Sequence, residues 1–180
     1  MARHLIRLSG SGGQGMITAG IILAAGASVI EGKKAIQSQS YGPEARGGAS
    51  KAEVIISDEE IYYPKVMAPE ILVALTQEAA DKYSKDLVKG GILILDDLMV
   101  KTPPKGDWKI YSMPIIRTAA EKVGKAMVAN VVTLGALNEI CGLVKPETLE
   151  AAVLSRVPKG TEELNKNAIA AGVELAKAVK

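Results

Sequence analysis

Cysteine, histidine and aromatic residues are scarce in this chain of 180 residues. It has one cysteine, one histidine and no phenylalanine, and aromatics make up 3% of the residues. A disulfide framework, a zinc finger and a self-contained iron–sulfur cluster each need several thiolates, so the single cysteine excludes all three. A core without phenylalanine must be built from valine, isoleucine, leucine and alanine, which suits a parallel sheet covered by helices.

The chain also lacks an excess of charge and a long apolar run. Its 22 basic and 20 acidic residues give a net charge of +2, so we expect no nucleic-acid partner. The most apolar segment, residues 16–30, is about 15 residues long, whereas a helix needs about 20 to cross a bilayer. No signal-peptide pattern opens the sequence. We therefore expect a cytoplasmic protein without a membrane partner, and a buried helix over residues 16–30.

Short apolar runs alternate along the chain with segments of helical periodicity. This alternation is typical of an α/β protein with a parallel sheet. Hydrophobic residues make up 48% of the chain, enough for one core, and no change in composition divides it. We therefore predict a single Rossmann-like α/β domain over residues 1–180, with a mostly parallel sheet flanked by helices. The predicted strands cover residues 4–9, 34–38, 51–57, 71–75, 92–95 and 109–112, and the predicted helices cover 16–30, 78–87, 115–123, 131–143, 146–156 and 162–179.

A glycine-rich turn connects the first predicted strand to the first predicted helix. Gly10, Gly12 and Gly15 match the pattern G-x-G-x-x-G, and Gly13 and Gln14 lie between them. Glycines let the chain turn tightly and approach a ligand closely, and the following helix offers backbone N–H groups to an anion. The loop therefore either contacts a phosphate, a carboxylate or a partner backbone, or is a purely structural turn.

Two common kinds of nucleotide site fit this loop poorly. A dinucleotide site uses an acidic residue at the end of the second strand, where this chain has Gln37, Ser38, Gln39 and Ser40, so NAD is disfavoured. No lysine follows the glycines, which excludes a P-loop. A free-standing nucleotide-binding protein stays an alternative hypothesis, because the motif does stand between a predicted strand and a predicted helix.

A second glycine-rich loop, residues 40–48 with the sequence SYGPEARGG, contains Tyr41, Glu44 and Arg46. Loops at this place in α/β proteins lie near the carboxyl edge of the sheet, where ligands bind. Arg46 could make a bidentate contact to a phosphate or a carboxylate. Alternatively, it fixes the loop through Glu44 or the backbone.

Four other residues have both a structural and a functional interpretation. His4 opens a strand without a catalytic partner nearby in the sequence, and Cys141 lies in an apolar helix, so we interpret both as structural. Asp96 and Asp97 end a buried strand, where a carboxylate either faces a ligand or fixes the following turn. We favour the turn.

The two glycine motifs in this order, GSGGQG followed by YGPEARGG, resemble those of the gamma subunit of 2-oxoacid:ferredoxin oxidoreductases. The resemblance covers nearly the whole chain. It implies a part in the oxidative decarboxylation of a 2-oxoacid with coenzyme A, which yields an acyl-CoA, carbon dioxide and reduced ferredoxin. It also implies that Gly10, Gly12, Gly13, Gln14 and Gly15 lie at a coenzyme A site or a subunit interface, together with Tyr41, Glu44 and Arg46.

The same resemblance implies partners that hold the redox cofactors. Alpha and beta subunits, with or without a delta subunit, would carry thiamine diphosphate, magnesium and the iron–sulfur clusters, and would pass electrons to ferredoxin. This chain alone is then expected to be inactive, without a catalytic residue, a metal or a cofactor of its own. We expect 2-oxoglutarate as the substrate, ahead of 2-oxoisovalerate and pyruvate, and an indolepyruvate enzyme is a related alternative. A purely structural subunit without ligand contact is a further alternative.

Overall fold

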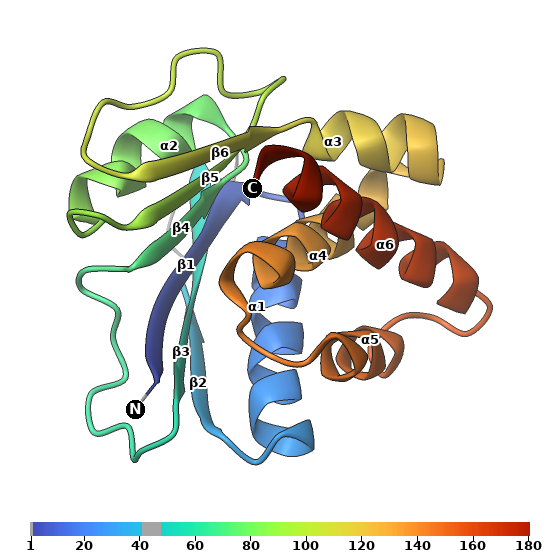
Figure 1. The fold of residues 1–180 in the computed structure, drawn as a ribbon, viewed down its shortest axis with the longest axis horizontal. Coiled ribbons are helices and arrows are strands. Elements are labelled where there is room, and N and C mark those ends of the chain that lie inside the picture. The colour runs from blue at the N-terminus through green and yellow to red at the C-terminus, as the bar shows by residue number, and fades with distance from the viewer. Residues whose placement is uncertain (1, 41–47) are drawn as a thin grey trace.

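The computed structural model describes residues 2–40 and 48–180, and it places helices on both faces of a six-stranded sheet (Figure 1). The strands are β1 (Arg3–Ser11), β2 (Lys34–Gln39), β3 (Ala49–Ser57), β4 (Ile71–Ala74), β5 (Ile92–Asp96) and β6 (Lys109–Met113). The α-helices are α1 (Met16–Ala25), α2 (Gln77–Tyr83), α3 (Ile115–Arg117), α4 (Ala129–Cys141), α5 (Pro146–Leu154) and α6 (Glu162–Val179). Short π-helical and 3-10 turns flank them, namely η1 (Gly26–Ile30), η3 (Ser84–Asp86), η4 (Thr118–Val123) and η5 (Ala126–Val128). The predicted α/β class is confirmed.

The strand order is β2-β3-β1-β4-β5-β6. Strands β1, β4, β5 and β6 are parallel neighbours, whereas β3 runs antiparallel to both β1 and β2. The sheet is therefore mostly parallel, as predicted, but β3 separates β2 from β1. The chain between β2 and β3 is too short for the crossover of a dozen or more residues that parallel neighbours need, so these two strands pair antiparallel.

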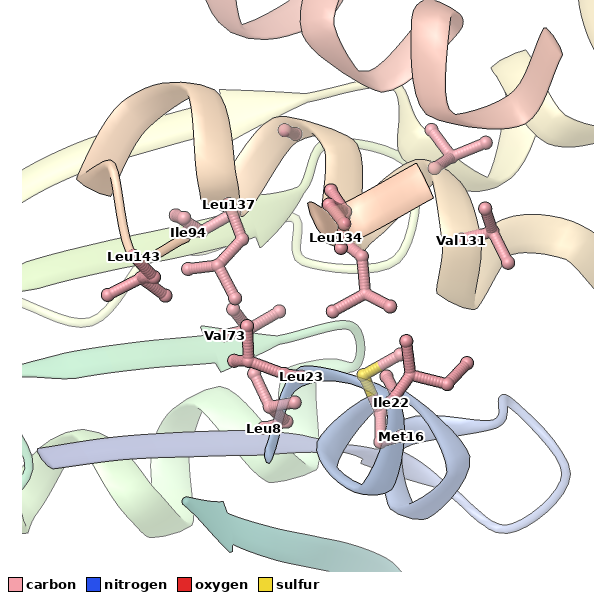
Figure 2. Packing of buried hydrophobic residues seen from close by; sticks show 14 of the residues in the cluster. Leu8, Met16, Ile22, Leu23, Val73, Ile94, Val131, Leu134, Leu137 and Leu143 are labelled. Carbon is pink, nitrogen blue, oxygen red and sulfur yellow. The ribbon is translucent and has the colours of Figure 1, made fainter. Parts of the chain in front are cut away.

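One face of the sheet carries most of the helices. Ile6 and Leu8 of β1 are fully buried on this face, and they belong to one apolar cluster with residues of α1 and α4. Figure 2 shows side chains of α1 and α4 pointing toward those of β1, β4 and β5. The opposite face is covered by α2 alone among the described α-helices, with a smaller cluster that includes Leu72 and Leu93. Alternation along the strands thus sends successive side chains into two different cores.

Helices α4 and α6 approach each other so closely that two glycines are required at their crossing. A Cβ atom added to Gly172 of α6 would collide with the carbonyl oxygen of Val132 and would lie 2.8 Å from the backbone nitrogen of Ala136. A Cβ atom on Gly135 of α4 would likewise collide with the carbonyl oxygen of Ile169. Both helices therefore pack backbone against backbone, and any side chain at these positions would push them apart.

A buried ion cluster occupies the face of β1 opposite to Ile6 and Leu8. The guanidinium of Arg7, which is 2% exposed, donates from Nε to Glu53 Oε1 at 3.0 Å and from Nη1 to Asp86 Oδ2 at 2.7 Å. Its Nη2 donates to the carbonyl oxygen of Val66 at 2.9 Å. The guanidinium also lies 5.4 Å from the centre of the Tyr83 ring, a cation–π contact. Arg7 therefore ties strand β3, the turn after α2 and the loop before β4 to strand β1.

Within residues 2–40 and 48–180, every helix falls short of the length and apolarity that crossing a bilayer requires.

Candidate functional site

The glycine loop closes on itself through the side chain of Gln14. Strand β1 continues to Ser11, beyond the predicted end at residue 9, and α1 begins at Met16. Gln14 Oε1 accepts a hydrogen bond from the backbone nitrogen of Ser11 at 2.7 Å, and the backbone nitrogen of Gln14 donates to the carbonyl oxygen of Ser11 at 3.3 Å. Gln14 therefore holds the turn in shape.

Three of the loop glycines occupy positions where a side chain would be strained or would collide with a neighbour. Gly13 and Gly15 have φ angles of 88° and 78°, which side chains disfavour. A Cβ atom on Gly15 would lie 2.8 Å from Asn130 Nδ2, and a Cβ atom on the buried Gly10 would collide with Oε1 of Gln14. At Gly13, by contrast, a Cβ atom would meet nothing within 4 Å. The loop is thus packed on one side and open at Gly13, where a ligand or a partner can approach the backbone.

The amino end of α1 follows the glycine loop directly. Gly15 caps the helix, no described side chain accepts a hydrogen bond from its first turn, and that turn contains no acidic residue. The free N–H groups and the helix dipole give this end a partial positive charge. The arrangement suits a negatively charged group, and the binding of such a group at this loop stays a prediction.

The glycine loop lies at a switch point of the sheet. From β1 the chain passes to α1 on one face, and from the adjacent β4 it passes to α2 on the other. In open α/β sheets such a divergence leaves a crevice at the carboxyl ends of the strands, where ligands bind. The glycine loop follows β1 directly, so it lies at this edge of the sheet, next to the end of β4.

Tyr41, Glu44 and Arg46 lie outside the described residues, but both ends of their loop are defined. Ser11 at the end of β1 pairs with Ala49 at the start of β3. Ser50 Oγ donates to the carbonyl oxygen of Gly10 at 3.4 Å, and at the other end of the loop the backbone nitrogen of Ser40 donates to the carbonyl oxygen of Lys51 at 3.3 Å. Both ends of the second loop therefore lie at the carboxyl edge, as the sequence predicted for this loop.

Asp96 has a structural role. Its side chain is fully buried, and Oδ1 accepts hydrogen bonds from the backbone nitrogens of Leu98 and Met99 at 3.0 and 2.9 Å. Oδ2 accepts a third from the nitrogen of Ile116 at 2.8 Å. Asp97 lies at the surface, where its Oδ2 is 3.6 Å from Nη2 of Arg117. The interpretation of Asp96 as a residue that fixes the turn after β5 is confirmed.

Asn130 and Arg7 are the residues that sequence reasoning missed. Asn130, at the start of α4, donates from Nδ2 to the carbonyl oxygen of Gly15 at 3.5 Å. The two residues are 115 positions apart, so no local pattern connects them. A polar residue in the first turn of a largely apolar helix was the only available signal. Arg7 gave an equally faint signal, as a cation between the apolar residues Ile6 and Leu8.

Cys141 is expected to be chemically inert in the native protein. Burial raises the pKa of its thiol to about 12, and the charge of Lys180 opposes this rise only in part. At pH 8 about one thiol in ten thousand would then be ionised, against about one in four for an unperturbed cysteine. We expect a chromogenic disulfide reagent to react at least roughly a hundredfold faster after unfolding in guanidinium. Equal rates in the native and unfolded protein would contradict this assignment.

Comparison with known proteins identifies the family. The family model described as pyruvate ferredoxin/flavodoxin oxidoreductase matches residues 5–175. The chain is 51% identical over 177 residues to the 2-oxoglutarate synthase subunit KorC of Methanocaldococcus jannaschii, with 97% of this chain and 95% of the relative covered. It is 32% identical to the pyruvate synthase subunit PorC of Methanothermobacter marburgensis, with 91% and 92% covered.

A solved structure agrees with this result. The gamma subunit of a keto/oxoacid ferredoxin oxidoreductase from Geobacter sulfurreducens matches with a TM-score of 0.93 and 50% identity. The match covers 100% of this chain and 99% of that subunit. The resemblance predicted from the two glycine motifs is confirmed, and the chain belongs to the pyruvate ferredoxin/flavodoxin oxidoreductase family.

Proposed function

We propose that this chain is the gamma subunit of a cytoplasmic 2-oxoglutarate:ferredoxin oxidoreductase. The observation that carries the proposal is the 51% identity, over nearly the full length of both chains, to a relative named as a subunit of 2-oxoglutarate synthase. The relative named for pyruvate is much less similar, at 32%. The assembled enzyme would convert 2-oxoglutarate and coenzyme A to succinyl-CoA and carbon dioxide, and would pass two electrons to ferredoxin.

The redox and decarboxylation chemistry belongs to partner subunits in this proposal. Thiamine diphosphate would activate the 2-oxoacid for decarboxylation, and iron–sulfur clusters would carry the electrons. A chain with one cysteine does not fit a cluster, and no group of three or more His, Cys, Asp or Glu in the described part of the chain could hold a metal ion. The partners would be alpha and beta subunits, with or without a delta subunit, and ferredoxin would bind to the complex.

The contribution of this chain would be to help bind coenzyme A. The open side of the glycine loop at Gly13 and the uncapped amino end of α1 can receive a phosphate. In the sequence Arg46 stands between β2, which ends at this edge, and β3, which begins there, and its guanidinium would supply a charged contact to the same group. These residues would bind and orient coenzyme A, and none of them would take part in a proton or electron transfer.

Reconstitution tests the proposed function. The chain is co-expressed with candidate alpha and beta subunits, and a panel of 2-oxoacids is assayed with coenzyme A and a viologen acceptor. We expect 2-oxoglutarate to give the highest kcat/KM, and we expect activity to depend on this chain. Full activity and assembly without the chain would refute the proposal, and a preference for 2-oxoisovalerate or pyruvate would refute its substrate.

Replacing Gly13 tests whether the glycine loop contacts coenzyme A. Gly13→Ala places a methyl group in the open space, so we expect the KM for coenzyme A to rise roughly tenfold while the complex still assembles. Gly90→Ala is the matched control, because Gly90 also has a positive φ, of 77°, and open space around it, but precedes β5 at the opposite edge. Both variants should lose about 1 kcal/mol of stability. An equal KM in both would indicate a purely structural loop.

Replacing Arg46 separates a ligand-binding role from a purely structural one. Loss of a charged contact to a phosphate costs about 1.5–3 kcal/mol, so Arg46→Ala should raise the KM for coenzyme A about tenfold or more. Native mass spectrometry of the variant complex checks that assembly is intact. An unchanged KM for coenzyme A in an intact complex would show that the second loop has a purely structural role.

A further inference from the structure

A cleft with a volume of about 220 Å³ lies in the helical layer, where α1, α4 and the start of α6 meet the turn between α5 and α6. Figure 1 shows this turn at the end of the layer that lies far from the sheet. Apolar side chains form most of the wall, among them Ile22, Val131 and Leu164. Met127, also in the lining, is 78% exposed. An apolar wall beside an exposed, flexible methionine is suited to an apolar ligand body.

The charged groups of the cleft are all positive. Lys125 and Arg156 line it, and no acidic residue does. Neither cation forms an ion pair with any residue in the described ranges 2–40 and 48–180. Because their charge is not compensated locally, the cleft favours an anionic group. A guanidinium and an ammonium that line one cleft can each bind a phosphate or a carboxylate.

A buried amide adds a directed polar group. Asn165, which is 4% exposed, lines the cleft and donates from Nδ2 to the carbonyl oxygen and Oγ1 of Thr161 at 2.9 and 3.3 Å. These bonds fix its carboxamide. Its Oδ1 accepts no hydrogen bond from the described residues, so it is left to accept one from an N–H group of a ligand.

We propose that this cleft binds a small amphiphilic anion, with its chain against the apolar wall and its charged end at Lys125 and Arg156. The volume is below the roughly 300–1,000 Å³ of sites for whole drug-sized ligands, so the cleft takes a chain segment. Such a segment has two sources: the phosphopantetheine arm of coenzyme A, or a free medium-chain fatty acid. This inference goes beyond the proposed function. The activity of the reconstituted enzyme tests the proposed function, and it does so independently of the cleft.

Methyl-labelled NMR of the full chain tests the inference with two probes, coenzyme A and octanoate. We expect the methyl signals of Ile22, Val131 and Leu164 to shift in a saturable way with one or both probes. A shift with coenzyme A identifies the cofactor arm as the ligand, and a shift with octanoate alone identifies a free amphiphile. No shift with either probe would overturn the inference, without touching the proposed subunit role.

Charge variants show whether binding occurs at the predicted end of the cleft. Arg156→Gln and Lys125→Gln should each weaken binding about tenfold, the usual effect of losing a charge-assisted contact. Lys159→Gln is the matched control, because Lys159 is in the same turn but does not line the cleft. It should bind the probe as the native chain does. Equal binding by all three variants would overturn the inference, and the spectra themselves report whether each variant is folded.

Discussion

Gly172→Ala is expected to lower the free energy of unfolding by about 3 kcal/mol, although the substitution lies in the middle of a helix. Alanine is the better helix former, by up to about 1 kcal/mol, so helix propensity alone predicts the opposite sign. The added Cβ atom, however, would collide with the carbonyl oxygen of Val132 and lie 2.8 Å from the nitrogen of Ala136, both in the backbone of α4. Backbone atoms cannot move aside as a side-chain end can, so the two helices must separate.

Calorimetry of the full chain measures this effect. For a chain of this length, a loss of about 3 kcal/mol corresponds to a fall in Tm of roughly 6–12 °C. Gly26→Ala is the control with a milder contact. The nearest atom to its added Cβ atom would be the Cβ atom of Ala152, at 3.2 Å. Its Tm should stay within about 3 °C of the native value. A higher Tm for Gly172→Ala would show that α4 and α6 can separate at little cost.

Sequence periodicity predicted best those elements whose bounds depend on the pattern of their own residues and not on a distant segment. The predicted helix over residues 162–179 is α6 in full, because its apolar face repeats over five turns. The helix predicted over residues 115–123 is α-helical only over Ile115–Arg117 and continues as a π-helical turn. The antiparallel place of β3 was not predicted either, since alternation indicates that a segment is a strand but not which strand lies beside it.

In the candidate site, too, the local features could be predicted from the sequence and the contacts between distant segments could not. The glycine loop and its place between β1 and α1 follow from a local motif, whose spacing reports the turn directly. The contact of Asn130 with Gly15 joins two segments that are distant in sequence, so only the folded structure reveals it. The same is true of Gly172, which looks like an ordinary small residue of an alanine-rich helix until α4 is placed against it.

Arg7→Met should be the most destabilising single change at the polar face of β1, with an expected loss of about 3–5 kcal/mol. Methionine preserves much of the length of the side chain but removes the charge that neutralises Glu53. The side chain of Glu53 is 10% exposed, and Lys51, whose Nζ lies 3.1 Å from Glu53 Oε1, would be its one remaining cation among the described residues. The carbonyl oxygen of Val66 would lose its donor as well, so the loop before β4 would be released from the sheet.

Urea denaturation of a set of variants separates the charge effect from a packing effect. Asp86→Asn removes the other ion pair of Arg7, but the side chain of Asp86 is 50% exposed, so this change should cost at most about 1 kcal/mol. Combining Arg7→Met with Glu53→Gln removes the uncompensated charge and should restore part of the lost stability. If Arg7→Met costs no more than Asp86→Asn, the cluster is solvated in solution and Arg7 does not anchor the loop. A buried charge without a partner costs far more stability than the absence of both charges. A double variant that is more stable than Arg7→Met alone would therefore show that the loss comes from the unpaired charge of Glu53 and not from packing.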